Sequence, residues 1–313
     1  MNTGRFVVDT ILGLLVWASV AGRLAAQETP ATNGPSVHML VTVEAMHGSD
    51  VPVINREDVM VHEGHDRDKV TGWVPVQGDH AGLELMLLID DLSDVSLGLK
   101  LDDLRKFIAA QPASTKIGVG YMQNGTARME QSLTSDHALA AKALRLPMGT
   151  PGSPYFSLSD VAKHWPESTA QREVVMVSDG IDRYYEGNDL QDPYVDAAIG
   201  DAQRAGIVVF ALYTPGAGHS GHTFYRAYWG QIFLSRLADE TGGESYSIGF
   251  YEPPVTYVPY LDDLARRLTH QYLLTFIAKP QKKSGLQRVK LTTEVPNAEL
   301  VAADRVYVPA PEH

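Results

Sequence analysis

The sequence predicts an α/β protein in which helices cover both faces of a mainly parallel sheet, with β-rich segments at either end. Three observations support this. Leu85 to Ile89 is a continuous apolar run, as in strands buried on both faces of a sheet. Strand-like and helix-like segments then alternate as far as His270, which is the order that βαβ units produce. Outside this region, short alternating segments are separated by turn formers.

The N-terminal β-rich part follows a tail rich in Pro, Thr, Asn and Gly. His38 to Val43 and Val51 to Val61 show strand-like apolar residues, and turn formers occupy residues 48–50 and 63–65. We therefore expect short antiparallel strands here.

The central part alternates between the two kinds of element. Further strands are expected over residues 117–122, 174–177, 207–213 and 245–248, and helices over residues 100–110, 136–144, 195–205, 229–241 and 260–270. In open sheets of this kind, ligands bind beyond the carboxyl ends of the strands. The loops that follow Ile89, Val177 and Tyr213 are therefore the first places to look for a site.

The C-terminal part returns to β-like texture, with strands expected over residues 272–278, 288–293 and 300–308. Each β-rich end has too few strands to bury a core by itself. We therefore expect the two ends to pair into one small companion module.

The first residues have the features of a secretory signal peptide. Arg5 is followed by the apolar run Ile11 to Ala21, and small residues precede the polar Gln27. The run is shorter than the ~20 residues of a membrane-spanning helix, so a retained anchor is the less favoured alternative. The predicted divisions are a signal peptide over 1–26, a linker and β-segment over 27–82, the α/β domain over 83–270 and a C-terminal β-segment over 271–313. The expected location is secreted or periplasmic.

Charge and composition exclude several classes of protein. A net charge of −12 argues against nucleic acid as a partner, because such binding depends on Lys and Arg. The chain has no cysteine, so disulfides do not stabilise it. No later segment has the apolar length of a membrane span.

Motifs for covalent chemistry are missing or weak. The sequence has neither a Gly-x-Ser-x-Gly elbow nor a phosphate-binding Gly-Lys-Ser/Thr. Gly216 to Gly221 formally matches a dinucleotide fingerprint, but Thr214-Pro215 separates it from the preceding strand. We therefore do not expect an enzyme.

Acidic residues end two of the predicted buried strands. Asp90 and Asp91 follow the strand at Leu85, and Asp179 follows the strand at Val174. Carboxylates from neighbouring strand ends can face one hydrated cation, with hydroxyl groups completing its oxygen shell. The pattern indicates a candidate divalent-ion site at the rim of the sheet.

Three segments resemble the loops of the metal-ion-dependent adhesion site in von Willebrand factor A (VWA) domains. They are Leu-Leu-Ile-Asp-Asp-Leu-Ser-Asp-Val-Ser (87–96), Gly-Ser-Pro-Tyr (152–155) and Val-Ser-Asp-Gly (177–180). Val-Thr-Val-Glu (41–44), Arg-Glu-Asp-Val-Met-Val-His-Glu (56–63) and Gln-Tyr-Leu-Leu-Thr-Phe (271–276) resemble the VWFA-related domain proteins of acidobacteria. The resemblance covers roughly residues 38–308.

The resemblance implies a Rossmann-like VWA domain that binds a protein ligand, with Mg²⁺ or Mn²⁺ at the rim. The implied metal ligands are Asp90, Asp94, Ser153 and Asp179, with Asp91 and Ser93 in reserve. The first loop departs from the family pattern Asp-x-Ser-x-Ser, because Leu92 occupies the first serine position and carries no ligand atom. A rim that persists as a metal-free scaffold is therefore an alternative.

Two further functions stay open at this stage. One is a secreted hydrolase that uses Asp90, Asp94, Asp179 and Asp182. The other is a structural envelope protein with an inert rim.

Overall fold

The computed structural model describes residues 34–76, 82–185, 187, 191–218, 223–247 and 255–310. The predicted signal peptide (1–26) lies outside these residues. Within the described part of the chain, no helix has both the length and the apolar character needed to cross a membrane.

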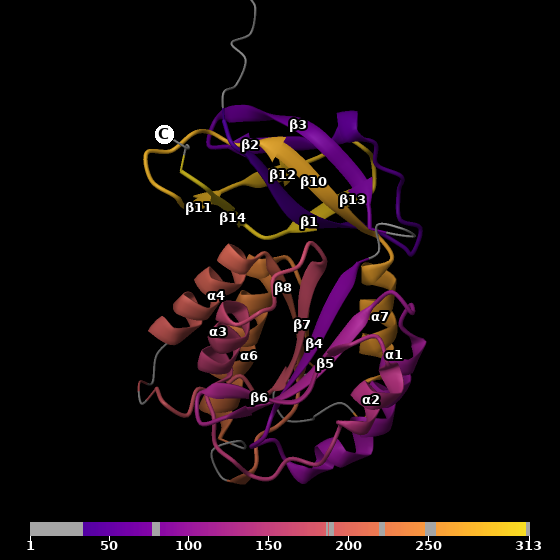
Figure 1. Cartoon of the computed structure of the whole chain (residues 1–313), viewed down its shortest axis with the longest axis vertical. Helices are drawn as coiled ribbons and strands as arrows, with labels where there is room; N and C mark the ends of the chain where they lie inside the picture. The colour runs from indigo at the N-terminus through magenta and orange to yellow at the C-terminus, as the bar shows by residue number, and fades with distance from the viewer. Residues whose placement is uncertain are drawn as a thin grey trace, which may run out of the picture. The chain divides into compact units, whose positions relative to one another are not determined.

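The central sheet has six strands in the order β6-β5-β4-β7-β8-β9 (Figure 1). The strands are β4 (Leu83–Asp90), β5 (Lys116–Gln123), β6 (Thr126–Thr134), β7 (Gln171–Ser178), β8 (Ile207–Tyr213) and β9 (Ser245–Tyr246). All neighbours pair in parallel except β5 and β6, which are antiparallel. Counted from β4, the order is 3-2-1-4-5-6, the doubly wound arrangement, and it reverses between β4 and β7.

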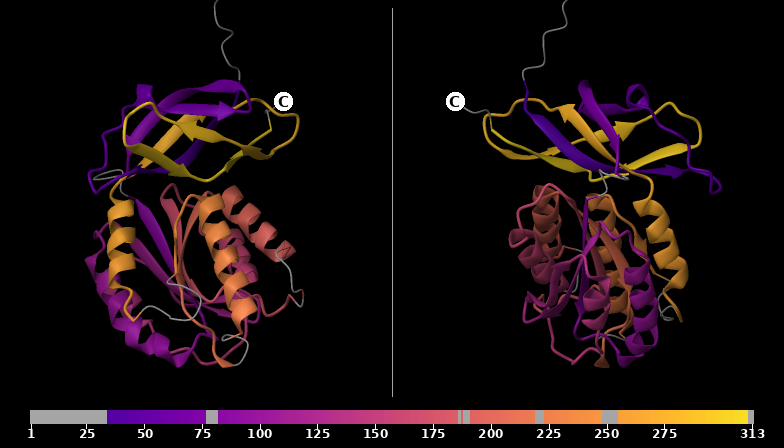
Figure 2. Two further views of the ribbon diagram at one scale, coloured as in Figure 1. Left: turned by 180° about the vertical axis from the view of Figure 1, so that it is seen from behind. Right: turned by 45° about the vertical axis from the view of Figure 1, so that its right-hand side comes forward.

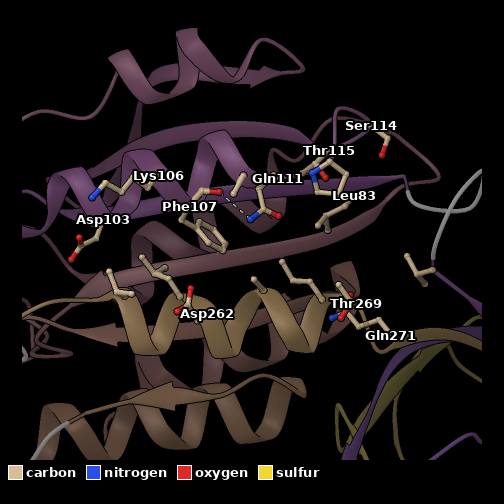
Figure 3. Close-up of a pocket in the computed structure, with 17 residues that line it drawn as sticks. Leu83, Asp103, Lys106, Phe107, Gln111, Ser114, Thr115, Asp262, Thr269 and Gln271 are labelled. Atoms are coloured by element: carbon tan, nitrogen blue, oxygen red, sulfur yellow. Dashed lines mark hydrogen bonds between the residues drawn. The ribbon is translucent and has the colours of Figure 1, made fainter. Parts of the chain in front are cut away.

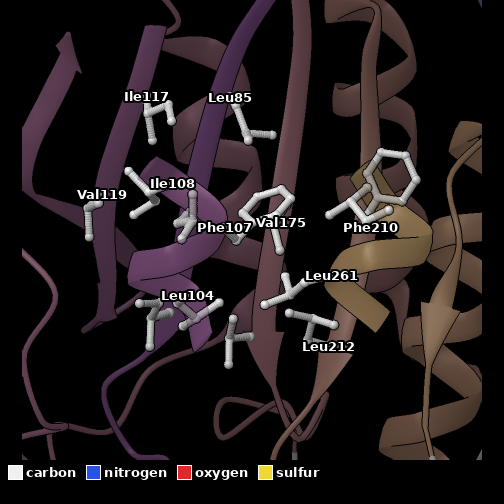
Figure 4. Packing of buried hydrophobic residues seen from close by; sticks show 14 of the residues in the cluster. Leu85, Leu104, Phe107, Ile108, Ile117, Val119, Val175, Phe210, Leu212 and Leu261 are labelled. Atoms are coloured by element: carbon white, nitrogen blue, oxygen red, sulfur yellow. The ribbon is translucent and has the colours of Figure 1, made fainter. Parts of the chain in front are cut away.

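Helices pack on both faces of this sheet (Figures 1 and 2). One face carries α1 (Leu101–Ala110), α2 (His137–Lys142) and α7 (Val258–Leu268), and the other carries α3 (Pro154–Lys163), α4 (Pro193–Ala205) and α6 (Phe224–Thr241). The side chains of β4 alternate between the two layers. Leu85 and Leu87 pack with α1 and α7 (Figure 4), and Met86 and Leu88 pack with α3, α4 and α6.

A second six-stranded sheet, in the order β12-β2-β3-β10-β1-β13, draws on both ends of the chain. Its strands are β1 (Ser36–Ala45), β2 (Met60–Glu63), β3 (Asp66–Pro75), β10 (Gln271–Ile277), β12 (Lys290–Thr292) and β13 (Ala298–Ala302). A two-stranded sheet pairs β11 (Gly285–Arg288) with β14 (Arg305–Val308). The late strand β10 lies between the early strands β1 and β3. The predicted fold class, with a β-rich module built from both ends, is therefore confirmed.

Several predicted elements differ in detail. Only the last part of the segment from Val51 to Val61 is a strand. Before it, residues 56–58 form a 3-10 turn, in which the backbone N–H of Asn55 donates to Asp58 Oδ2 (2.9 Å). Predicted strands 288–293 and 300–308 each divide between two sheets, because the chain turns from one sheet to the other within them.

The sequence did not predict strand β6 or helix α3 of the central region. Strand β6 is polar and largely exposed at the sheet edge, so it lacks the apolar signal of its neighbours. Helix α3 begins at Pro154, and the hydroxyl of Ser153 caps it by accepting from Phe156 N–H (3.2 Å). The sheet is mainly parallel, as predicted, and β6 pairs antiparallel with β5 at its edge.

Candidate functional site

The point where the strand order reverses brings together the carboxylates of Asp90 and Asp179. Asp90 ends β4, and Asp179 directly follows the neighbouring strand β7. Their exposed fractions are 3% and 1%. Ligand sites of doubly wound sheets lie at this reversal, and this is the edge at which the sequence predicted the candidate site.

Asp90 is satisfied from inside the protein. Its Oδ1 accepts the backbone N–H of Leu92 at 2.9 Å, and its Oδ2 accepts the hydroxyl of Ser178 at 3.0 Å. Burial and, to a smaller degree, the charge of Asp179 raise the pKa of Asp90 above its ordinary value. The raised pKa favours a proton on this carboxyl.

Asp179 forms a buried ion pair. Its Oδ2 lies 2.6 Å from Nη2 of Arg183, and its Oδ1 accepts the backbone N–H of Ile181 at 2.9 Å. The side chain of Arg183 is 11% exposed, and its Nη1 donates to the carbonyl of Ile181. Burial by itself would lower the pKa of Arg183, but the charges of Asp179, Asp90 and Asp182 outweigh it and raise that pKa.

The loop after β8 closes over this ion pair. A Cβ placed on Gly216 would lie 2.2 Å from Asp179 Oδ2 and 2.5 Å from Arg183 Nη2, so only glycine fits. The same loop pairs with the loop after β4, because Asp94 N–H donates to the carbonyl of Pro215 (2.8 Å). Two rim loops thus hold each other above the carboxylates.

Ser153 and Asp182 form a second buried contact. The hydroxyl of Ser153 donates to Asp182 Oδ2 at 2.7 Å, and Oδ1 of Asp182 accepts the backbone N–H of Tyr184 at 2.7 Å. Burial raises the pKa of Asp182. The hydroxyl of Ser153 therefore has two roles: it donates to Asp182 and it caps the start of α3.

Asp94 acts as a helix cap. Its Oδ1 accepts the backbone N–H of Ser96 at 2.9 Å, at the start of the 3-10 helix η3 (Val95–Lys100). Its charge also acts on the buried ammonium of Lys100. Coordination of a metal ion by Asp94, as predicted, would compete with its role as the cap of η3.

The two reserve residues have different surroundings. Asp91 is fully buried and accepts from Arg145 Nη1 (2.6 Å) and Gln123 Nε2 (2.8 Å). Burial by itself would raise the pKa of Asp91, but the hydrogen bonds, chiefly from Arg145, lower it. Ser93 is buried, and its Oγ has no hydrogen-bond partner in the structure.

The donor set does not fit a divalent cation. Magnesium requires near-octahedral oxygen ligands. Here each oxygen of Asp90 and Asp179 already accepts a hydrogen bond from the protein, and Ser153 donates to Asp182. Of the predicted ligand and reserve residues, all of them described, Ser93 has a buried hydroxyl without a hydrogen-bond partner. In the described ranges, no group of three or more His, Cys, Asp or Glu residues is arranged to hold a metal ion.

Sequence reasoning missed Arg183, Gly216 and Ser178. A signal for Arg183 existed, because it follows Asp179 by four residues in Asp-Gly-Ile-Asp-Arg and could turn back onto it. Gly216 was considered only as part of a nucleotide motif. A glycine is needed at this position because the loop after β8 lies against Asp179 and Arg183, which are far from it in the sequence.

A pocket of about 810 Å³ lies between α1 and α7 (Figure 3). Lys106 and Phe107 of α1 and Leu261 and Asp262 of α7 are among the residues that line it. None of the candidate rim carboxylates lines it. The pocket is thus separate from the candidate site.

No protein-family model matches the sequence, and no curated protein matches it. The solved structures that the chain resembles include VWA domains. BatB from Bacteroides thetaiotaomicron has 14% identity and a TM-score of 0.42, over 60% of this chain and 98% of BatB. The SpRpn10 VWA domain has 13% identity and a TM-score of 0.40, over 58% of this chain and 93% of that domain. The pilus adhesin SpaC from Lactobacillus rhamnosus GG, in its open conformation, has 9% identity and a TM-score of 0.45, over 81% of this chain and 48% of SpaC.

Proposed function

We propose that the protein is an exported, VWA-type binding protein that recognises a protein partner at the carboxyl rim of its central sheet. The observation that carries this proposal is a set of exposed apolar side chains on segments at the carboxyl edge of the sheet. They lie in the loop after β4, the loop before α3, α3 itself, the loop after β7 and the start of α6. They are Val95 (73% exposed), Leu99 (81%), Leu146 (53%), Met148 (62%), Phe156 (36%), Tyr184 (47%), Phe224 (38%) and Tyr225 (67%).

Contacts link several of these side chains across segments. A Cβ on Gly98 would lie 2.7 Å from a methyl group of Leu146, so the loop after β4 touches the loop before α3. The rings of Phe156 and Tyr184 lie 6.0 Å apart, joining α3 to the loop after β7. Apolar side chains that gather on a surface mark interaction sites, whereas scattered ones are ordinary.

The same arrangement favours binding over hydrolysis. Three of the four carboxylates that a hydrolase would use, Asp90, Asp179 and Asp182, are at most 5% exposed and are engaged by protein donors. The fourth, Asp94, is half-buried and caps η3. General acid–base catalysis needs such groups within reach of a substrate. The apolar rim, by contrast, is directly accessible.

The proposal is tested with photo-crosslinking residues placed in the native host at Leu99 on the rim and, as a control, at Val53, which is 78% exposed in the β-rich module. A partner captured from Leu99 would be purified and titrated against wild type and variants. We expect Leu99→Ser with Met148→Ser to raise its Kd by at least about tenfold, because buried apolar contacts of this size contribute over 1 kcal/mol each. The matched control, Val53→Ser with Met46→Ser, should leave the Kd unchanged.

Equal crosslinking from Leu99 and Val53, or a Kd that ignores the rim variants, would contradict the proposal. Turnover of a polysaccharide or peptide substrate that is lost in Asp182→Asn would instead favour the hydrolase. An inert envelope protein would yield no saturable partner at either position.

A further inference from the structure

We infer that Arg183 is a built-in cation that takes the electrostatic place of a divalent metal at the rim. The inference rests on the contact between Asp179 and Arg183 and on the loop that covers it. It concerns how the rim is held together, so it stands or falls separately from the identity of any partner.

The acidic groups around Arg183 favour a positive charge at its position. Three buried carboxyl groups, Asp90, Asp179 and Asp182, act electrostatically on the guanidinium of Arg183. Carboxyl groups gathered at one buried place disfavour one another's ionisation, and a positive charge among them stabilises the ionised form. A guanidinium remains protonated at every pH that proteins tolerate, so it supplies that charge permanently.

Both oxygens of Asp179 accept hydrogen bonds from the protein. Arg183 donates to Asp179 Oδ2 at 2.6 Å, which is the length of a strong charge-assisted hydrogen bond. The other oxygen of Asp179 already accepts from Ile181. A metal ion at Asp179 would therefore compete with Arg183 for a carboxylate whose two oxygens are already engaged.

The loop after β8 leaves little space beside the pair of Asp179 and Arg183. The backbone of Gly216 lies so close to both members of the pair that a single added carbon atom would overlap them. Magnesium dehydrates reluctantly and usually keeps several waters. A hydrated ion would therefore have to move the loop after β8, which hydrogen bonds from Asp94 and Ala217 tie to the loop after β4.

Leu92 is consistent with the same conclusion. It stands where the family pattern has a serine hydroxyl, and its backbone groups instead hold the rim: its N–H donates to Asp90 and its carbonyl accepts from Ala217. A rim that already contains a cation does not need a serine hydroxyl as a metal ligand at this position.

The experiment compares four full-length proteins after EDTA treatment: wild type, Arg183→Gln, Arg183→Gln with Asp179→Asn, and the control Arg145→Gln. The control breaks a second Asp–Arg pair, Asp91–Arg145, in which the aspartate is buried and the N···O separation is the same 2.6 Å. Thermal melts and calorimetric titrations use MnCl₂ and MgCl₂ as the probes.

We expect the melting temperature of wild type to be indifferent to both ions. Arg183→Gln should melt lower without metal and gain Mn²⁺ binding. At a concentration 100-fold above its Kd, the ion should favour the native state by about 100-fold. Restoring neutrality with Asp179→Asn should remove the gain, and Arg145→Gln should lose stability without gaining metal binding.

Stoichiometric Mn²⁺ binding to wild type that Asp179→Asn abolishes would overturn the inference. The inference would also be overturned if Arg183→Gln folds but neither binds the two ions nor changes its melting temperature with them. If Arg183→Gln does not fold with or without metal, the wild-type titration still decides, together with Arg183→Lys, which keeps the charge and should remain indifferent to metal.

Discussion

Glu173 on β7 is a buried acid whose ionisation should make stability depend on pH. Its side chain is fully buried, Oε1 accepts from Gln271 Nε2 at 2.6 Å, and Oε2 has no hydrogen-bond partner in the structure. Burial raises its pKa from the ordinary 4.5 to about 8, and the hydrogen bond from Gln271 offsets only part of this. The protonated form is therefore the one that the folded protein prefers.

The sign and size of the effect follow from linkage. Because the folded-state pKa exceeds the unfolded one, the stabilisation is complete below pH 4.5 and is lost as the pH rises through about 8. The free energy of unfolding falls by up to about 1.4 kcal/mol per pH unit in this window. Between pH 5 and pH 8 the loss from this one group is about 3.5 kcal/mol.

Glu173→Gln removes the titration. The assay is urea unfolding of wild type and variant at a series of pH values from 5 to 8. We expect the stability of the variant relative to wild type to increase by about 3.5 kcal/mol across this range. The difference between the two proteins isolates Glu173 from other titrating groups.

Glu84 on the neighbouring strand β4 is a matched control with the opposite sign. It is also buried, but hydrogen bonds from Trp165, Ser168 and Lys116 outweigh its burial and lower its pKa. Its contribution is present above the unfolded pKa and is lost as the pH falls. Glu84→Gln should therefore be most destabilising at neutral pH. Parallel pH profiles for wild type and Glu173→Gln would refute the reasoning.

Three further predictions follow from the fold and the sequence. Gly216→Ala would place its Cβ 2.2 Å from a carboxylate oxygen and should destabilise by roughly 1–3 kcal/mol in urea unfolding; an unchanged midpoint would mean that the loop is not closed over the pair. Deleting residues 271–313 removes β10 from between β1 and β3, so hydrogen exchange over residues 37–74 should accelerate, and unchanged exchange would contradict the joint module. Mass spectrometry of the exported protein should find an N-terminus near Gln27, whereas an intact Met1 would refute signal cleavage.

Local pattern was sufficient to predict the central architecture. The strands β4, β7 and β8 are buried on both faces over most of their length, so each contains an uninterrupted apolar run (85–89, 174–177 and 207–213), and that signal is visible in the sequence. The same pattern drew attention to Asp90 and Asp179, because each lies at the end of such a strand. Strand β6 escaped prediction because an edge strand is exposed and needs no apolar run.

The partners of the rim side chains were decided only by the tertiary structure. Beyond the end of a strand, the direction of a side chain depends on how its loop folds and on what other loops lie against it. Ser153 reaches Asp182, Asp94 caps a helix, and Arg183 turns back onto Asp179 beneath a glycine 33 residues later in the chain. The sequence alone determined that acidic residues meet at this rim. Contacts between loops far apart in sequence decided that an arginine lies among them.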